Sequence, residues 1–310
     1  MTVFYLGLVG VGLLLGLLGG GGSLLLVPLL IYLGGFPVKS AIALSLSVVG
    51  ATSLIAAVRH TRQGNVCWKN GLAFGLSGMA GAYGGGRLAG FVPENLLMIL
   101  FALMMLVTAL SMLLGQRLRG GIETPPGAPC PARLHLSAVL FDGLLVGVVT
   151  GLVGVGGGFV IVPALNLLGG LAMRAAIGTS LLVIGMNSLA ALIGYSGHAP
   201  LDGQTVALLS AITIPASLLG HHLSRLLPSH WLRHGFGMSA LLLAGFLLQR
   251  EVSWASIEEV KHLVSLHQEF FRGILTAVAL ILLYWIRGLI HQKELRQDRP
   301  SKPLTHDAQA

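Results

Sequence analysis

Long apolar segments separated by short polar connections make up most of the sequence. In the first part of the chain they cover residues 3–22, 24–34, 40–58, 71–91 and 95–115. In the second part they cover residues 136–153, 159–171, 175–195, 204–227 and 230–249. A helix needs about 20 apolar residues to cross a hydrocarbon core, and that core tolerates neither open sheet edges nor lipid-exposed loops. The pattern therefore predicts an all-α integral membrane protein.

Two of these segments, 24–34 and 159–171, are too short for a comfortable crossing, and each follows a cluster of glycines. Clustered glycines weaken a helix, and a proline inside it adds a break. We therefore expect glycine-broken helices here, which form either short crossings or re-entrant segments. Each half then has about five membrane segments, and the number of full crossings depends on which form is adopted.

A polar connection divides the chain. Residues 116–135 are rich in proline, glycine and arginine, a composition that ends helices. We predict that they form a cytoplasmic linker between a first membrane repeat, 1–115, and a second, 136–250. After the second repeat we expect an interfacial helix and a final transmembrane helix in residues 251–292, followed by a polar cytoplasmic tail, 293–310.

The two halves match each other without gaps. GLLGGGGSLLLVPLL from Gly16 matches GLVGVGGGFVIVPAL from Gly151, an offset of 151 minus 16, or 135 residues. At the same offset Pro28 meets Pro163. A register held over this distance indicates a duplication. An odd number of crossings in each half makes the two repeats inverted in the membrane, an arrangement that many secondary transporters use.

The charges predict the orientation. The chain is 54% hydrophobic and 10% charged, with a formal net charge of +8, and its basic residues form no single stripe, so nucleic acid is not an expected partner. With the N-terminus outside, most basic residues fall on one side, which the positive-inside rule assigns to the cytoplasm of a bacterial inner membrane. They include Arg59, Arg62, Lys69, Arg117, Arg119, Arg133, Arg174, Arg225 and Arg233.

Cys67 and Cys130 lie in connections on this side, so we expect reduced thiols.

The glycine clusters are the strongest candidates for a substrate site. They consist of Gly19, Gly20, Gly21 and Gly22 with Ser23, and of Gly154, Gly156, Gly157 and Gly158. Neither cluster fits a phosphate-binding loop or a dinucleotide fingerprint, which argues against nucleotide binding. Glycines also let membrane helices pack closely. However, backbone whose helical hydrogen bonds are broken at membrane depth must be buried in protein or line a water-filled cavity. The free N–H groups at the N-termini of half-helices attract anions. We therefore expect the two clusters to frame an anion site.

The paired glycine motifs, each followed by Val-Pro, resemble those of the sulfite exporter TauE/SafE family of membrane permeases. The resemblance covers about residues 5–250, and GLVGVGGGFVIVP with AIGTSLLVI downstream is the more typical motif. It implies export or uptake of sulfite, of sulfonates such as sulfoacetate, or of related sulfur-containing organic anions. The first motif departs from the pattern, with Ser23 where Gly158 stands and Gly20 where Val155 stands.

Polar residues near the clusters extend the predicted substrate site. They are Ser45, Ser53, Asn166, Thr179, Ser180, Asn187 and Ser188. Ser45 with Ser180 and Ser53 with Ser188 are related by the repeat, although such hydroxyls often only bond to neighbouring helices. Asp142 and His198 are candidates for proton coupling or gating. A carboxylate within a membrane segment, such as Asp142, is costly and is therefore a functional candidate. The imidazole of His198 titrates near neutral pH.

We therefore expect a secondary transporter that moves a small anion through the bilayer, with a proton as one candidate coupling ion. An anion channel is the nearest alternative. A membrane-embedded enzyme or assembly factor is disfavoured because the sequence contains no metalloprotease motif, no nucleophile motif with partners and no metal-ligand spacing. No cofactor or metal is expected, and the sequence leaves the oligomeric state open.

Overall fold

The computed structural model describes residues 2–18, 22–119, 130, 136–154, 156–165, 171, 173–197, 202–224 and 229–251. The described residues form helices and no strand. The helices are α1 (Thr2–Leu18), α2 (Ser23–Tyr32), α3 (Val38–Arg62), α4 (Trp68–Ala89), α5 (Glu94–Arg119), α6 (Leu136–Val153), α7 (Gly158–Pro163), α8 (Met173–Tyr195), α9 (Gly203–Ser224) and α10 (Ser229–Glu251). The helices predicted in 251–292, the tail and nearly all of the linker lie outside the described residues.

Several helices have the length and composition of membrane spans. Among the described residues, Val38–Arg62, Ala175–Tyr195 and Gly203–Leu223 are long and apolar enough to cross a membrane. Shorter apolar helices accompany them, including Thr2–Leu18 and Val139–Val153. The part of the chain that the structure describes is therefore all-helical, and the protein is a multi-pass membrane protein, as the apolar pattern predicts.

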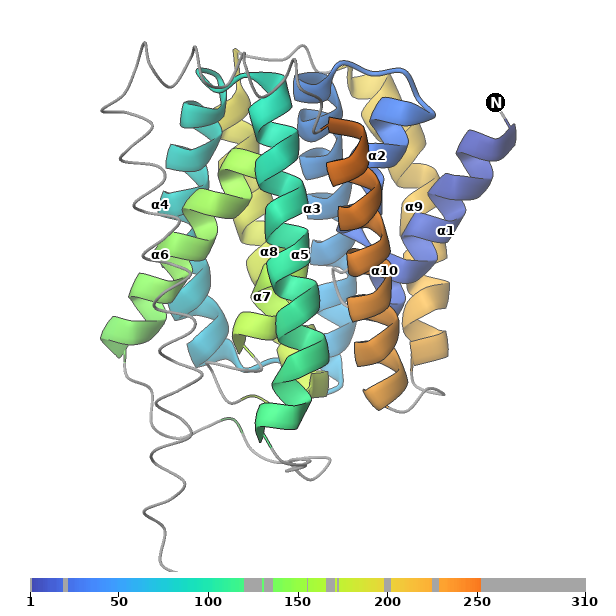
Figure 1. The fold of residues 1–310 in the computed structure, drawn as a ribbon. Coiled ribbons are helices and arrows are strands. Elements are labelled where there is room, and N and C mark those ends of the chain that lie inside the picture. Colours follow the sequence, from blue (N-terminus) through green and yellow to red (C-terminus); the bar gives the residue numbers. More distant parts are fainter. Residues whose placement is uncertain are drawn as a thin grey trace, which may run out of the picture.

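Two helical hairpins contain the short helices. In Figure 1, α1 descends from the upper right and α2 returns to the upper edge, whereas α6 rises from the lower left and α7 turns back downward. With 10 residues, α2 is too short to span a membrane, and α7 has only 6. The predicted breaks after both glycine clusters are thus present, and the two hairpins enter the bundle from opposite faces.

The basic connections share one face, which we call the lower face. The C-terminal ends of α3, α5 and α9 and the N-terminal ends of α4, α6, α8 and α10 lie at the lower edge of Figure 1. Arg59 and Arg62 are at the end of α3, and Lys69 is at the start of α4. The structure therefore brings these separate basic segments together.

Close crossings of small residues hold the hairpins in the bundle. A Cβ added to Gly16 of α1 would lie 1.8 Å from the Ser217 carbonyl oxygen of α9, and one added to Gly151 of α6 would lie 2.3 Å from the Ala82 carbonyl oxygen of α4. Both partners are offset by the repeat distance, since 151 minus 16 and 217 minus 82 each give 135. Only glycine permits helices to approach this closely. The two crossings are thus related by the repeat offset, and each joins a helix of one half to a helix of the other.

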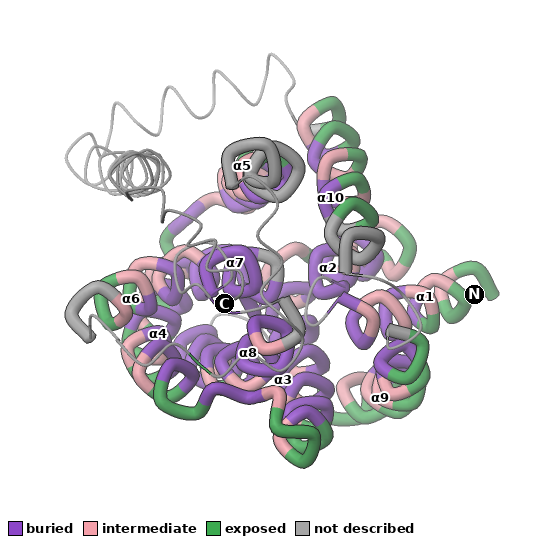
Figure 2. The backbone as a smooth tube through the Cα atoms, turned by 90° about the horizontal axis from the view of Figure 1, so that it is seen from below, coloured by how far each residue is buried: buried purple, intermediate pink, exposed green. Residues whose placement is uncertain are grey.

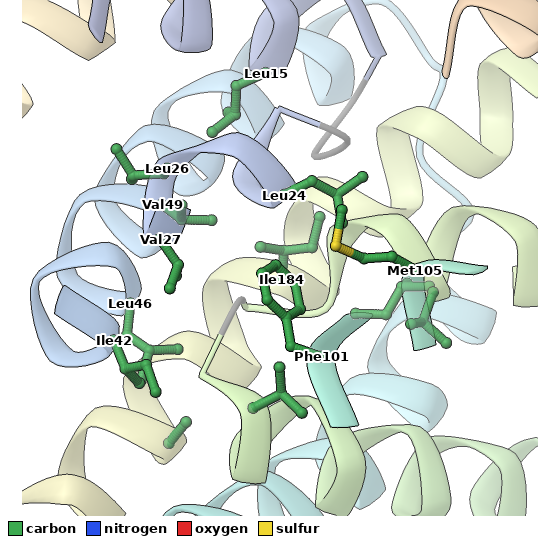
Figure 3. Packing of buried hydrophobic residues seen from close by; sticks show 14 of the residues in the cluster. Leu15, Leu24, Leu26, Val27, Ile42, Leu46, Val49, Phe101, Met105 and Ile184 are labelled. Carbon is green, nitrogen blue, oxygen red and sulfur yellow. The ribbon is translucent and has the colours of Figure 1, made fainter. Parts of the chain in front are cut away.

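The core lies around α3 and α8. In their apolar windows 72% of the residues are buried, against 33% in α9, so α3 and α8 are interior and α9 is peripheral. In Figure 2 these two helices lie between α4 and α9 and are mostly buried, whereas exposed residues are concentrated on outer helices such as α9 and α10. Figure 3 shows side chains of α2, α5 and α8, among them Leu24, Met105, Phe101 and Ile184, gathered in one apolar cluster.

A disulfide joins the linker to the start of α4. Cys67 and Cys130 are bonded, with 5.7 Å between their Cα atoms, so the prediction of reduced thiols is wrong. The partners are 63 positions apart, and they meet because α5 returns the chain to the lower face. Disulfides are typical of oxidising compartments and rare in the cytosol, whereas the basic residues on the same face favour the cytoplasm. The two features thus favour opposite assignments for this face.

Candidate functional site

The second glycine cluster forms the turn between α6 and α7. Gly154, Gly156 and Gly157 have φ angles of 72°, 65° and 76°, in the left-handed region that other L-residues rarely adopt. The Gly154 N–H donates to the Thr150 carbonyl oxygen at 2.9 Å, which closes the end of α6. Glycine is therefore required here by backbone conformation as well as by space.

Ser188 of α8 lies against this turn at the middle of the bundle. A Cβ on Gly156 would be 2.7 Å from the Ser188 Oγ and 3.1 Å from Val49 Cγ1, and a Cβ on Gly50 would be 3.0 Å from the Ser188 Cβ. Gly50 is the central residue of α3, twelve positions from each end (50 minus 38 and 62 minus 50). The glycine turn, α3 and α8 therefore meet at Ser188 near mid-membrane depth.

Several polar side chains on α3 and α8 are buried without a hydrogen-bond partner among the described residues. Ser45 and Ser53 are 0% exposed, and Asn187 and Ser188 are 1% exposed. The hydroxyl oxygens of these serines and both amide atoms of Asn187 have no partner there. A buried polar group left unpaired costs about 1–3 kcal/mol. We call these four residues of the adjacent helices α3 and α8 the polar cluster, and a polar ligand beside them would satisfy their unpaired groups.

Asn187 is placed beside α4. A Cβ on Gly78 would be 2.7 Å from the Asn187 Oδ1 and 2.8 Å from its Nδ2. The amide group thus lies in the space that this glycine leaves open. Because α3 belongs to the first half and α8 to the second, the polar cluster draws on both halves of the chain.

The first glycine cluster differs in detail. Gly22 has φ −65° and ψ −19°, an ordinary right-handed conformation, whereas Gly157, its counterpart at the repeat offset, is left-handed. A Cβ on Gly22 would be 2.2 Å from the Leu15 amide nitrogen, so the chain packs tightly against α1. Ser23 is fully buried at the start of α2. The other two predicted glycines of this cluster, Gly19 and Gly21, lie outside the described residues.

Other predicted site residues have local structural partners. Thr179 Oγ1 accepts the Cys67 N–H at 2.9 Å and thereby caps the start of α4. The Ser180 hydroxyl donates to the Ile177 carbonyl oxygen of its own helix at 2.8 Å. The contact of Gly157 is with Thr150, whose Cγ2 would be 2.6 Å from an added Cβ. Thr179, Ser180 and Gly157 therefore have partners outside the polar cluster, whereas Gly156 lies directly against Ser188.

Of the two candidates for proton coupling, Asp142 is among the described residues. Asp142 is half-buried in the second turn of α6, near the lower face. His198 and Asn166 lie outside the described residues, and Gly158 begins α7. At the opposite end, exposed Asp202 caps α9: hydrogen bonds from the side chain and backbone of Thr205 and from the backbone of Gln204 lower the pKa of its carboxyl.

Sequence reasoning missed a buried pair of histidines. His60 of α3 and His221 of α9 are each 5% exposed, with their ring centroids 4.3 Å apart. His60 stands two residues before the end of α3 among exposed basic residues, so its position in the sequence resembles that of a surface residue. One signal was available, because His60 follows Ser53 by seven positions (60 minus 53), which places both on the same face of a helix.

A multi-pass helical bundle with a glycine-opened turn and unpartnered polar groups is an arrangement typical of membrane transporters. The chain belongs to the sulfite exporter TauE/SafE family, whose model matches residues 3–247. It is 34% identical over 258 residues to a probable membrane transporter protein of Xylella fastidiosa (strain 9a5c), covering 80% of this chain and 94% of the relative.

More distant relatives carry the same description. The chain is 30% identical over 237 residues to the probable membrane transporter protein YdhB of Bacillus subtilis (strain 168), covering 76% of this chain and 95% of the relative. A probable membrane transporter protein of the archaeon Methanocaldococcus jannaschii is 30% identical over 191 residues, which cover 60% of this chain and 68% of the relative. No solved structure matches the chain.

Proposed function

We propose that this protein is a secondary transporter that carries a small anion, namely sulfite, a sulfonate or a related sulfur-containing organic anion, across a bacterial inner membrane. The observation that carries the proposal is the Ser188 hydroxyl. It is buried to 1% exposure beside Gly156 and the midpoint of α3, and it has no hydrogen-bond partner among the described residues.

The chemistry of the cluster favours an anion over a cation. Ser45, Ser53 and Ser188 offer O–H donors, and Asn187 adds N–H donors. No acidic residue occurs in the sequences of α3, α4 or α8, so these helices offer no carboxylate to balance a bound cation. Sulfite and sulfonate oxygens accept hydrogen bonds, and a donor to a charged ligand contributes about 1.5–3 kcal/mol.

Two inverted repeats would provide alternating access to this site. The oppositely directed hairpins and the glycine crossings at the repeat offset support this arrangement. Ser53 and Ser188 are related by the same offset (188 minus 53 gives 135), so each repeat contributes a buried, unpartnered hydroxyl. Rocking of one repeat against the other would expose such a central site to each side in turn.

Transport in proteoliposomes tests the proposal. We expect saturable flux of labelled sulfite or sulfoacetate in vesicles containing the protein and none in empty vesicles. Ser188→Ala removes one donor to the anion and should raise KM by roughly 10- to 150-fold, which corresponds to about 1.5–3 kcal/mol.

Ser47→Ala is the matched control. Ser47 is also on α3, but its hydroxyl already donates to the Ala43 carbonyl oxygen at 2.9 Å, so its loss should leave KM unchanged. Flux that does not saturate would indicate a channel. Absence of flux for both anions would refute the proposed substrate class, and equal effects of the two substitutions would refute the proposed site.

A further inference from the structure

We propose that His60 and His221 together form a proton-binding site that couples proton movement to anion transport. The proposal rests on the proposed transport function and adds to it a coupling ion and the residues that bind it. The ring centroids are 4.3 Å apart with the planes inclined at 62°, and both rings are nearly inaccessible. Imidazole is the side chain that exchanges a proton most readily near neutral pH.

The pair lies where α3, α8, α9 and the first hairpin meet. A Cβ on Gly16, in the last turn of α1, would be 2.8 Å from the His221 amide nitrogen, and a Cβ on Gly178 of α8 would be 3.1 Å from His60 Nδ1. α1 ends at Leu18, immediately before the first glycine cluster. The two rings therefore lie beside the hairpin that carries this cluster, at the lower ends of α3 and α9.

Buried hydroxyls connect the pair with the centre of the bundle. On α9, Ser217 precedes His221 by four positions (221 minus 217), which is one helical turn, or about 6 Å along the axis. On α3, Ser53 precedes His60 by seven positions, or about 10 Å along the axis. The hydroxyls of Ser53 and Ser217 are buried and have no partner among the described residues. On α3, Ser53 of the polar cluster thus lies two turns from one imidazole, and on α9 Ser217 adds a buried hydroxyl one turn from the other.

Gln63 makes the site responsive to protonation. Its Nε2 lies 3.3 Å from His221 Nε2, and an amide nitrogen can only donate, so this contact requires His221 Nε2 to be unprotonated. A proton on that nitrogen forces the amide to rotate and present its oxygen. Gln63 is the residue that ends α3, at the turn into α4. A proton at His221 therefore changes contacts at the lower face, where the anion would enter or leave.

The charged surroundings link proton binding to the anion. Basic residues occur close to the pair in sequence or at the same ends of the helices: exposed Arg59 and Arg62 on α3, exposed His222 on α9, and exposed Lys69 at the start of α4. Arg174 precedes Gly178 by one turn in the sequence of α8. The titratable residues of α1 and α2 are Tyr5, near the start of α1, and Tyr32, at the end of α2, so both are at the helix ends away from the first glycine cluster. The sequences of α1, α2, α3, α4, α8 and α9 contain no acidic residue.

A bound anion adds a negative charge to the bundle and thereby favours a proton on the pair. By linkage, the anion raises the affinity for the proton by the same factor as the proton raises the affinity for the anion. The imidazole takes up the proton on one side of the membrane and releases it on the other when the anion leaves. Anion and proton consequently move in the same direction.

Two transport measurements separate coupling from binding. Labelled sulfite and labelled sulfoacetate are followed in parallel, first as uptake driven by a pH gradient with the acid side outside, and then as exchange against unlabelled anion without a gradient. Exchange needs anion binding and carrier movement, but no release of the proton. In His60→Gln and His221→Gln we expect exchange to persist and gradient-driven uptake to fall by about 5- to 150-fold, the usual range of coupling between two ligands.

His222→Gln is the matched control, because it removes an exposed imidazole at the adjacent position and should retain both activities. Normal gradient-driven uptake in both buried variants would overturn the proposal, as would an equal loss in His222→Gln. Absence of exchange in the wild-type protein would refute the proposed substrate class instead.

A measurement without substrate tests the proton site by itself. In protein labelled with ¹⁵N-histidine, two rings in contact cannot bind protons independently. His60→Gln should therefore change the titration curve of His221, and His221→Gln that of His60, whereas His222→Gln changes neither. Unchanged curves in the buried variants would overturn the proposal even if transport is lost through misfolding.

Discussion

Gly156→Ala combines backbone strain with obstruction of the proposed site, and the structure allows the two effects to be separated. The φ of Gly156 is 65°, where an L-residue costs about 1–2 kcal/mol. The new methyl group would also be 2.7 Å from the Ser188 Oγ and 3.1 Å from Val49 Cγ1, so the hydroxyl must move. If the displaced hydroxyl no longer binds the anion, the loss of about 1.5–3 kcal/mol raises KM by roughly 10- to 150-fold.

Gly35→Ala reproduces the strain without the contact. Its φ is 70°, and nothing lies within 4 Å of an added Cβ. We expect both variants to lose thermal stability, measured by intrinsic fluorescence in detergent, with the larger loss in Gly156→Ala because its methyl group also meets Ser188 and Val49. Only Gly156→Ala should raise the KM of sulfite or sulfoacetate flux. A normal KM in Gly156→Ala, or an equal rise in Gly35→Ala, would refute the assignment of Ser188 and the glycine turn to the site.

Two further predictions concern the ends of the bundle. Alkylation of the unreduced protein should modify neither Cys67 nor Cys130, because the two are bonded to each other. After reduction, a membrane-impermeant thiol reagent should label the exposed Cys130 in inverted vesicles but not in intact cells. Labelling in intact cells but not in inverted vesicles would place the lower face outside. Hydrogen bonds from Thr205 and Gln204 lower the pKa of the Asp202 carboxyl below its ordinary value of 3.8. The ionised carboxylate that caps α9 therefore stabilises the fold fully at pH values above 3.8. This stabilisation is lost as the pH falls through the lowered pKa. Asp202→Ala should thus lower Tm at neutral pH and have progressively less effect in acid; a difference from wild type that does not change with pH would contradict the ionised cap.

The apolar pattern alone determined that the chain is a helical membrane protein. Hydrocarbon leaves the backbone few ways to satisfy its hydrogen bonds, so composition and segment length suffice for that conclusion. The short segments after each glycine cluster were also visible, because glycine and proline act on the local backbone. The motif GLVGVGGGFVIVP, from Gly151 onward, was enough to indicate the family.

Which polar residues remain without a partner was decided only by the tertiary structure. Thr179 and Ser188 are equally plausible in sequence, yet the first caps α4 at Cys67 and the second meets Gly156 with no partner among the described residues. His60 and His221, 161 positions apart (221 minus 60), come into contact because α9 packs on α3, and Cys67 meets Cys130 because α5 returns the chain to the same face. Periodicity in the sequence reports the face of a helix on which a residue lies, whereas its partner depends on which other helix covers that face.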